Sequence, residues 1–194
     1  STSGTLVVDA YSGYNQVCTP EKRKRGGCLA HVRRKVFDAS SKTPAMKEGL
    51  DLILEVYLVE HEAKERGLVR TPEHLALRQS RSRPAMDAPH RWLEVQKPGY
   101  LPSEPAGKAV SYALENWSHL CVFLDDVDVP PDNNAAETAL RIVAKTRDSS
   151  LFVGNDQAGV NLGVLLTLVR CAEACGHNPQ QCLADLLMRV QTTP

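Results

Sequence analysis

The sequence predicts a mainly α-helical protein with only a few short strands. Apolar residues recur at helical spacing over most of the chain, and Pro or Gly stands at the ends of these stretches. Only two runs favour a strand, at residues 5–8 and 151–153. A length of 194 residues is enough for one domain with a real core, or for one domain and a subdomain.

Composition limits the function classes. Hydrophobic residues make up 42% and charged residues 24%, as in an ordinary globular protein, and the formal net charge is zero. Any nucleic-acid binding must therefore come from local patches. No apolar run reaches about 18 residues, so we expect no membrane partner. The first residues do not form a signal peptide, and six scattered cysteines favour a reduced, cytoplasmic setting.

A short apolar run at residues 5–8 leads to Asp9. The run lacks polar alternation, so we expect a buried strand. An aspartate just past the end of a buried strand is a common place for chemistry in α/β folds. It is equally a turn former that accepts a hydrogen bond from its own backbone. The residues alone leave both roles of Asp9 open.

Residues 21–35 carry seven basic side chains and one acidic side chain. We expect a flexible segment at 21–27 and a helix at 28–39. Such a local excess of positive charge can engage phosphates. The candidate contacts on the helix are His31, Arg33, Arg34 and Lys35. The alternative is a solvated helix face, with His31 packed as an ordinary helix residue.

Residues 45–120 are expected to form an all-helical block. Its helices should cover 45–66, 71–82, a stretch beginning at Pro84, and 104–120. Gly67 should end the first of these helices. Pro89 should kink or shorten the third, because proline lacks an amide hydrogen. The apolar stripes of this block predict core rather than a cofactor site.

Four aspartates and no basic residue occupy residues 125–132. Two prolines prevent a helix before Asp132, which is a good N-cap for the helix that follows. On this helix Asn133, Glu137 and Arg141 share one face. A carboxylate on a helix at the end of an acidic loop suits a divalent metal ion. Alternatively, Asp132 only caps the helix and Glu137 complements its dipole.

Cysteines gather near the C-terminus, where we expect a turn at 154–159 and helices at 159–174 and 179–190. The possible metal ligands are Cys171, Cys175, His177 and Cys182. Their spacing does not match a usual zinc site, so we expect packed thiols and no zinc.

Four stretches, in order, resemble motifs of the insertion-sequence-66 class of bacterial transposases. DNNAAE at 132–137, followed by Leu140 and Arg141, resembles the third catalytic motif, although Thr138 stands where the family usually has arginine. VVDAYSGY, which contains Asp9, resembles the second aspartate motif. CLAHVRRK resembles the basic helix, and TRDSSLFVG resembles a segment that usually reads RKNWLFxG. The resemblance covers nearly the whole chain.

This resemblance implies a ribonuclease-H-like nuclease in which two aspartates and a glutamate hold two Mg²⁺ or Mn²⁺ ions. It assigns Asp9 and Glu137 as catalytic and metal-binding residues, which we expect to be neighbours. It implies transposon-end DNA as the partner, bound by the basic helix together with Arg141 and Arg147. Supporting roles fall to Asp132, Asn133 and Asn134. Only eight residues precede Asp9, so we expect a C-terminal part of the catalytic domain that does not cut DNA alone.

The implied fold class is mainly α, the C-terminal part of a ribonuclease-H-like α/β core with a large helical insertion. Its parts would be 1–40, a partial core, 41–120, an insertion whose arginines help to hold DNA, and 121–194, the rest of the core. The alternative is a non-catalytic helical DNA-binding or assembly protein derived from a transposase, which Thr138 favours. Because the strand at 5–8 lacks sheet partners, we also expect a homo-oligomer.

Overall fold

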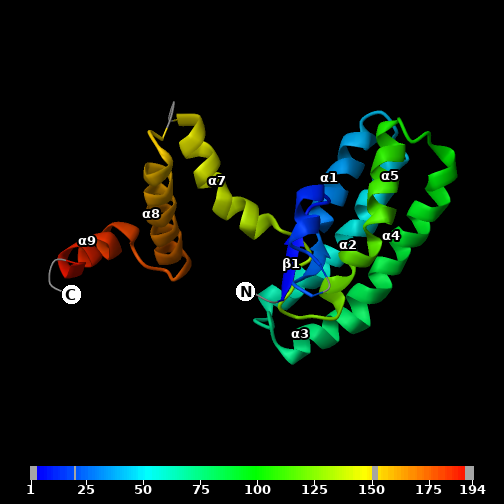
Figure 1. Ribbon diagram of the computed structural model, residues 1–194. Coiled ribbons are helices and arrows are strands. Elements are labelled where there is room, and N and C mark those ends of the chain that lie inside the picture. The colour runs from blue at the N-terminus through cyan, green and yellow to red at the C-terminus, as the bar shows by residue number, and fades with distance from the viewer. Residues whose placement is uncertain (1–3, 20, 150–152, 191–194) are drawn as a thin grey trace. The chain divides into compact units, whose positions relative to one another are not determined.

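The computed structural model describes residues 4–19, 21–149 and 153–190. The chain divides into two compact units, residues 1–133 and 134–194, and each is described by itself. Helices dominate both units (Figure 1), so the prediction of a mainly α-helical protein is confirmed.

The first unit begins with a two-stranded parallel sheet. Strand β1 (Thr5–Val8) pairs with β2 (Lys24–Gly27), and Val8 lies opposite Gly27. The connection contains a 3-10 turn, η1 (Ser12–Gln16), and its described residues form no α-helix. The strand at 5–8 is confirmed, but Val8 alone of its residues is buried, and β2 supplies a sheet partner that we expected the strand to lack. The expectation of a flexible 21–27 is wrong. Basic and glycine residues rarely form strands, and here the backbone of β1 supplies the partner for β2.

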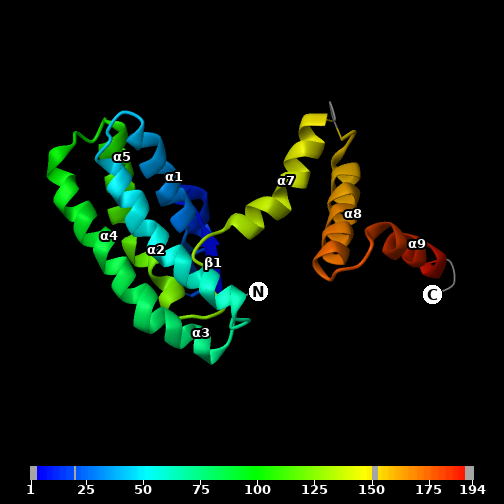
Figure 2. The same cartoon turned by 180° about the vertical axis from the view of Figure 1, so that it is seen from behind.

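Six helices of the first unit follow the sheet in the described residues, and four of them pack along one another. Their bounds are α1 (Leu29–Ser40), α2 (Met46–Glu65), α3 (Pro72–Leu77), α4 (Arg83–Gln96), α5 (Pro105–Glu115) and α6 (Trp117–Leu120). Helix α1 packs on α2 and α5, while α4 packs on α2 and α5, so the four form a bundle (Figures 1 and 2). Gly67 ends α2 with a φ of 67°, as expected for a helix-terminating glycine.

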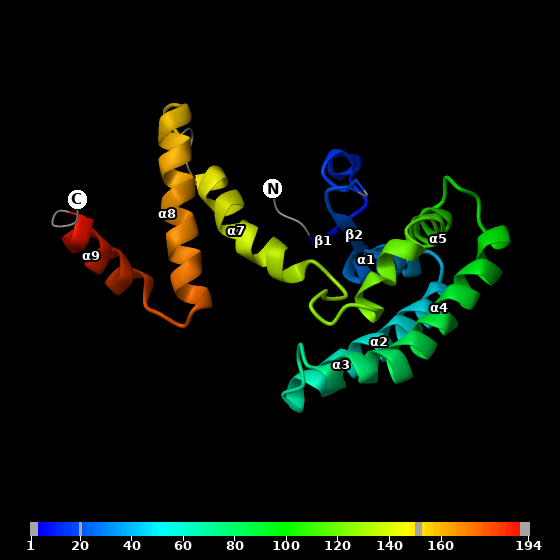
Figure 3. The ribbon, with the colours of Figure 1, turned by 60° about the horizontal axis from the view of Figure 1, so that its bottom comes forward.

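The third and fourth helices are joined without a loop. The connecting turn η2 (Arg78–Ser82) is a π-helix, and Figure 3 shows α3 leading into α4 beside α2. Pro89 does not shorten α4, which continues to Gln96. Conversely, the expected single helix over 104–120 is interrupted at Asn116, whose ψ of 8° is not helical. Its side-chain amide donates to the carbonyl of Tyr112 at 2.8 Å.

The core of the first unit lies inside the four-helix bundle. Its large buried apolar side chains come from the helices and from the short turn η4 (Val122–Leu124), while the turn η3 (Lys97–Gly99) follows α4 at the bundle's edge. The most enclosed are Leu29, Met46, Met86, Leu93, Leu120, Phe123 and Leu124. The expectation that the helical stripes make core is therefore confirmed.

The second unit consists of α7 (Asn134–Ser149), α8 (Asp156–Ala174) and α9 (Pro179–Val190). Within it, α8 packs against both neighbours. Helix α8 begins three residues earlier than expected, because the side chain of Asn155 accepts the N–H of Ala158 at 2.8 Å and caps it. Of the strand expected at 151–153, residues 151 and 152 lie outside the described residues. No helix in the described residues is long and apolar enough to cross a membrane.

Candidate functional site

The carboxyl edge of the parallel sheet brings Asp9 and Cys28 together. Each residue directly follows a strand, and the strands end opposite each other, so both leave the sheet at the same edge. Oδ1 of the half-buried Asp9 accepts the N–H of Tyr11 at 3.2 Å, and its carbonyl accepts Nη2 of Arg25 at 2.6 Å. The turn-forming role of Asp9 is therefore present. Oδ2 accepts no hydrogen bond within the described residues, so the carboxylate keeps an oxygen for a ligand.

Helix α5 of the helical block contributes Tyr112 to the surroundings of Asp9. The ammonium of Lys35 on α1 lies 4.6 Å from the centre of the Tyr112 ring, a cation–π contact. Burial raises the pKa of the Tyr112 phenol; the N–H of Ala10 partly offsets this increase and the charge of Asp9 adds to it. The phenol therefore remains protonated beside the carboxylate.

Residues 131–133 are tied to the start of α1 and to α2. The carbonyl of Pro131 accepts the N–H of Leu29 at 2.9 Å. The hydroxyl of Tyr57 donates to Oδ2 of Asp132 at 3.2 Å, and the N–H of Asn133 donates to Sγ of Cys28 at 3.5 Å. Burial, followed by the Asp132 carboxylate, raises the pKa of Tyr57, and burial likewise raises the pKa of the Cys28 thiol. Both side chains therefore keep their protons.

The helix expected to follow Asp132 is present, although it begins at Asn134. Asp132, which we expected to cap this helix, accepts a hydrogen bond from the hydroxyl of Tyr57 on α2. Glu137 lies in the first turn of α7 and is half-buried, and Arg141, one turn later, is exposed. Asp9 and Glu137 belong to different units, so their proximity stays a prediction. Arg147 belongs to α7, but its side chain lies outside the described residues.

The basic face of α1 is exposed. Leu29, Val32 and Val36 turn the other side of the helix into the core. Arg33 and Arg34 face solvent and form no ion pair with any carboxylate of residues 4–19, 21–149 or 153–190. His31, one turn before Lys35, is half-buried and so stands apart from this exposed face.

In the described part of the chain, several arginines of the helical block, unlike those of α1, have acidic partners. Arg66 and Arg81 both pair with Glu62, and Arg83 pairs with Asp125. Arg70 lies 3.7 Å from Asp128. These guanidinium groups, which the sequence offered as DNA contacts, already have acidic partners, so a phosphate would have to displace a carboxylate.

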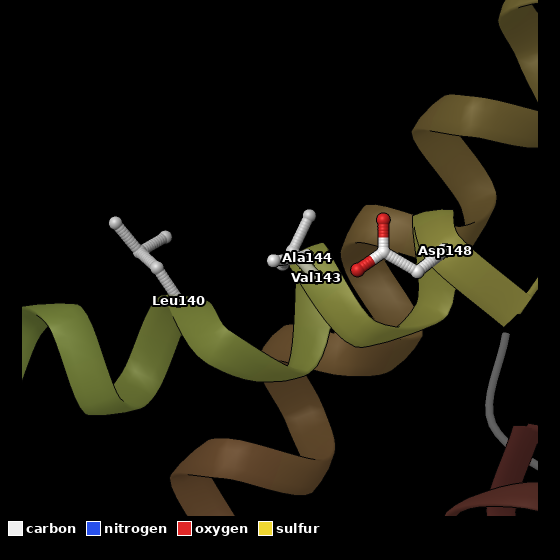
Figure 4. A pocket seen from close by; sticks show the side chains of 4 residues that line it. All are labelled: Leu140, Val143, Ala144 and Asp148. Atoms are coloured by element: carbon white, nitrogen blue, oxygen red, sulfur yellow. The ribbon is translucent and has the colours of Figure 1, made fainter.

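Hollows in the second unit are largely apolar. One, of about 480 Å³, lies along α7 beside Leu140, Val143, Ala144 and Asp148 (Figure 4). A larger one, of about 620 Å³, lies between α7 and α8 and is lined by residues such as Ala139, Ile142, Leu166 and Cys171. Cys171, Cys175 and His177 are exposed and Cys182 is half-buried, so the expectation of packed thiols is wrong. Within the described residues, no group of three or more His, Cys, Asp or Glu side chains is placed to hold a metal ion.

Sequence reasoning missed Tyr57, Cys28 and Tyr112 as neighbours of the motif residues. Tyr57 belongs by its spacing to an apolar stripe of the helical block, and nothing in the sequence separates its hydroxyl from those of the other tyrosines. Cys28 gives a signal only once β2 is known, because its place at the sheet edge follows from the pairing of β1 and β2.

Comparisons with known proteins are consistent with the motifs. A family model described as "Transposase IS66 family" matches residues 1–161. Three proteins of Sinorhizobium fredii, each described as uncharacterized, are similar over almost the whole chain. They are y4jD, 33% identical over 98% of this chain and 38% of its own length, y4hP, 30% identical over 98% and 37%, and y4qI, 28% identical over 97% and 36%. The chain thus spans well under half the length of these relatives. No solved structure matches.

Proposed function

The chain belongs to the IS66 family of transposases, and from this premise we propose that it takes part in DNA transposition as a portion of a metal-dependent nuclease. The observation that carries the proposal is the place of Asp9, a motif carboxylate at the carboxyl edge of a parallel sheet with one oxygen open to a ligand. In the proposed site, Asp9 and Glu137 hold Mg²⁺ or Mn²⁺ in a ribonuclease-H-like core. A pair of such ions stabilises the attacking and leaving oxygens of a phosphodiester.

This chain's own residues supply the surroundings of that chemistry. The Asp9 carboxylate is oriented by the N–H of Tyr11, and the strand end that carries it is fixed by Arg25. The protonated Tyr112 lies beside it, and the ammonium of Lys35 contacts the ring of Tyr112. Mg²⁺ requires near-ideal coordination geometry, so a carboxylate whose orientation is already fixed suits it.

We further propose that DNA phosphates contact the exposed face of α1 through Arg33, Arg34 and Lys35. Arg33 and Arg34 form no ion pair with a carboxylate of the described residues, whereas Arg66, Arg81 and Arg83 of the helical block each have an acidic partner. Electrostatic contact with phosphate is sequence-independent and salt-dependent, which suits a surface that holds DNA rather than reads it. Arg141, exposed on α7, is a further candidate.

A second candidate function is that of a non-catalytic DNA-binding or assembly protein derived from a transposase. The observation that favours it is Thr138, which replaces the arginine usual in the family beside Glu137. The two candidates share the α1 surface and differ in whether Asp9 and Glu137 bind metal.

Mn²⁺ titration of the full chain, followed by electron paramagnetic resonance, separates the two candidates. If the site exists, Asp9→Asn and Glu137→Gln should each weaken Mn²⁺ affinity by about tenfold or more. Asp38→Asn, which removes an exposed carboxylate from α1, is the control and should leave the affinity unchanged. Equal affinities in all four proteins would refute the metal site and leave the non-catalytic candidate.

DNA binding is tested by the salt dependence of affinity for a duplex. Arg33→Ala/Arg34→Ala/Lys35→Ala should flatten the slope of log K against log salt by about 0.9 for each phosphate that the variant no longer neutralises. The matched variant Arg66→Ala/Arg81→Ala/Arg83→Ala removes the same charge from arginines that already have carboxylate partners, and its slope should change much less. The same slope change in both variants would show that α1 is not the DNA surface.

A further inference from the structure

The segment 123–133 connects the helical block to α7 and is held to the first unit along most of its length. Beyond η4 it contains no helix or strand, yet its carbonyls, side chains and one amide make hydrogen bonds to residues of α2, of η2 and of the start of α1. A surface loop can be held by the two elements that it connects, so these additional hydrogen bonds show that the segment is attached to the first unit along its length.

Arg78 fastens the first half of the segment. Its side chain is 2% exposed, and Nη1 donates to the carbonyls of Phe123, Asp126 and Val129 at 2.9, 3.0 and 2.9 Å. Nε and Nη2 bind the two carboxylate oxygens of Glu60 at 2.8 and 2.7 Å. The planar guanidinium thus uses one edge for Glu60 and the other for the segment, a geometry that a lysine cannot reproduce.

Tyr57 fastens the second half. It lies on α2 three residues before Glu60, hence on the same face of that helix. Its hydroxyl holds Asp132, while Pro131 and Asn133 on either side are bonded to Leu29 and Cys28. The last three residues before α7 are therefore attached next to the sheet edge from which Asp9 emerges. Helix α7 begins directly after them, at Asn134, and carries Glu137 in its first turn.

We propose that Tyr57 and Arg78 are positioning residues, which fix segment 123–133 on the face of α2 and thereby set the point from which α7 carries Glu137. The inference rests on the proposed metal site for its functional consequence and on the contacts of the first unit for the fastening itself. In this arrangement the helical block does more than fill a core, because α2 holds the segment after which α7 begins.

Tyr57→Phe tests the proposal, because it keeps the ring and removes only the hydroxyl that holds Asp132. Tyr100→Phe is the matched control: its hydroxyl makes a hydrogen bond of the same length, 3.2 Å, but to Gln96 and not to the segment. Hydrogen exchange measured by mass spectrometry on the full chain should show amides of residues 132–137 exchanging about fivefold faster in Tyr57→Phe, the effect of removing one hydrogen bond. Exchange in α4 and α5 should not change, and Tyr100→Phe should match the wild type over 132–137.

Mn²⁺ affinity supplies the readout that a purely structural role would not move. At temperatures where all variants are folded, Tyr57→Phe should weaken Mn²⁺ binding by about fivefold, and Tyr100→Phe should not. Unchanged exchange over 132–137 in Tyr57→Phe would overturn the fastening. Faster exchange with unchanged Mn²⁺ affinity would overturn the positioning of Glu137. If the wild type itself binds no Mn²⁺, the proposed metal site is refuted, while the exchange comparison still decides whether Tyr57 fixes the segment.

Discussion

Replacing Arg78 with methionine should destabilise the first unit strongly. Methionine fills a similar volume but leaves the Glu60 carboxylate without its bidentate partner and three carbonyls of segment 123–133 without a donor. Removing one member of a buried ion pair typically costs about 3–5 kcal/mol, because the other charge stays desolvated. The carboxylate of Glu60 is only 16% exposed, so we expect a loss near the middle of that range, about 4 kcal/mol.

Urea unfolding followed by tryptophan fluorescence measures this loss. Trp92 and Trp117 both lie in the first unit, so the signal reports the part of the molecule that contains Arg78. Against a total stability of about 5–15 kcal/mol for an ordinary domain, the shift in the midpoint should be unmistakable. Arg78→Lys, which keeps the charge but not the planar fork, should lie between the wild type and Arg78→Met and serves if the latter does not fold.

Arg81→Met is the control, because Arg81 lies three residues after Arg78 in the same π-helical turn. Arg81 pairs with Glu62 in the solvent-exposed layer, and Glu62 also binds Arg66, so the carboxylate keeps a partner. Exposed pairs of this kind contribute little, and the midpoint should scarcely move. If Arg78→Met cost no more than Arg81→Met, the buried cluster would not stabilise the unit and the reasoning would fail.

Three further predictions concern packing, pH and assembly. Gly107→Ala should destabilise the first unit, because its Cβ would lie 2.0 Å from the carbonyl oxygen of Leu101, whereas Gly99→Ala, with no atom within 4 Å, should be neutral in the same urea assay. Burial, and then the charge of Arg78, lowers the pKa of His74, while the charge of Glu60 opposes the shift. As the pH drops, the unfolded chain therefore binds a proton at His74 before the folded chain does, so the free energy of unfolding should fall below about pH 6.5. His74→Asn should flatten this pH dependence. We also expect self-association, through the edge of β1 that β2 leaves open or through the exposed apolar residues of α8 and α9, and a strictly monomeric sedimentation profile at high concentration would contradict it.

Long helices were predictable because several local signals agree on each of them. For α2, the apolar stripe, the preceding proline and the terminating Gly67 place the ends within one residue of those observed. The last helix, α9, was likewise predicted by the proline after Asn178, and its bounds agree with the expected 179–190. Asp9 was recognised as both a turn former and a candidate ligand, and the turn-forming hydrogen bond is present.

The second strand could not be predicted, because its cause is not local. The sequence KRGG has low strand propensity, and its extended backbone is held by pairing with β1, which lies well upstream in the chain. Arg78 is a similar case. Arg78, Arg81 and Arg83 look alike in sequence, yet only Arg78 turns inward, because the π-helical turn at Arg78–Ser82 and the packing of α2 decide which guanidinium faces the core.

The distribution of charge explains how a chain of zero net charge can carry a local surface for a polyanion. Acidic residues are not spread evenly: Glu60 and Glu62 on α2, with Asp125 and Asp128 in segment 123–133, lie against the arginines of the helical block. Their fields cancel at short range, within the roughly 8 Å over which charges act at physiological salt. On α1 no carboxylate of the described residues pairs with Arg33 or Arg34, so three basic side chains beside the single Asp38 leave that face with a net positive charge. The arginines that pair with these carboxylates therefore carry little free positive charge, which is why we propose α1 rather than the helical block as the surface for a phosphate backbone.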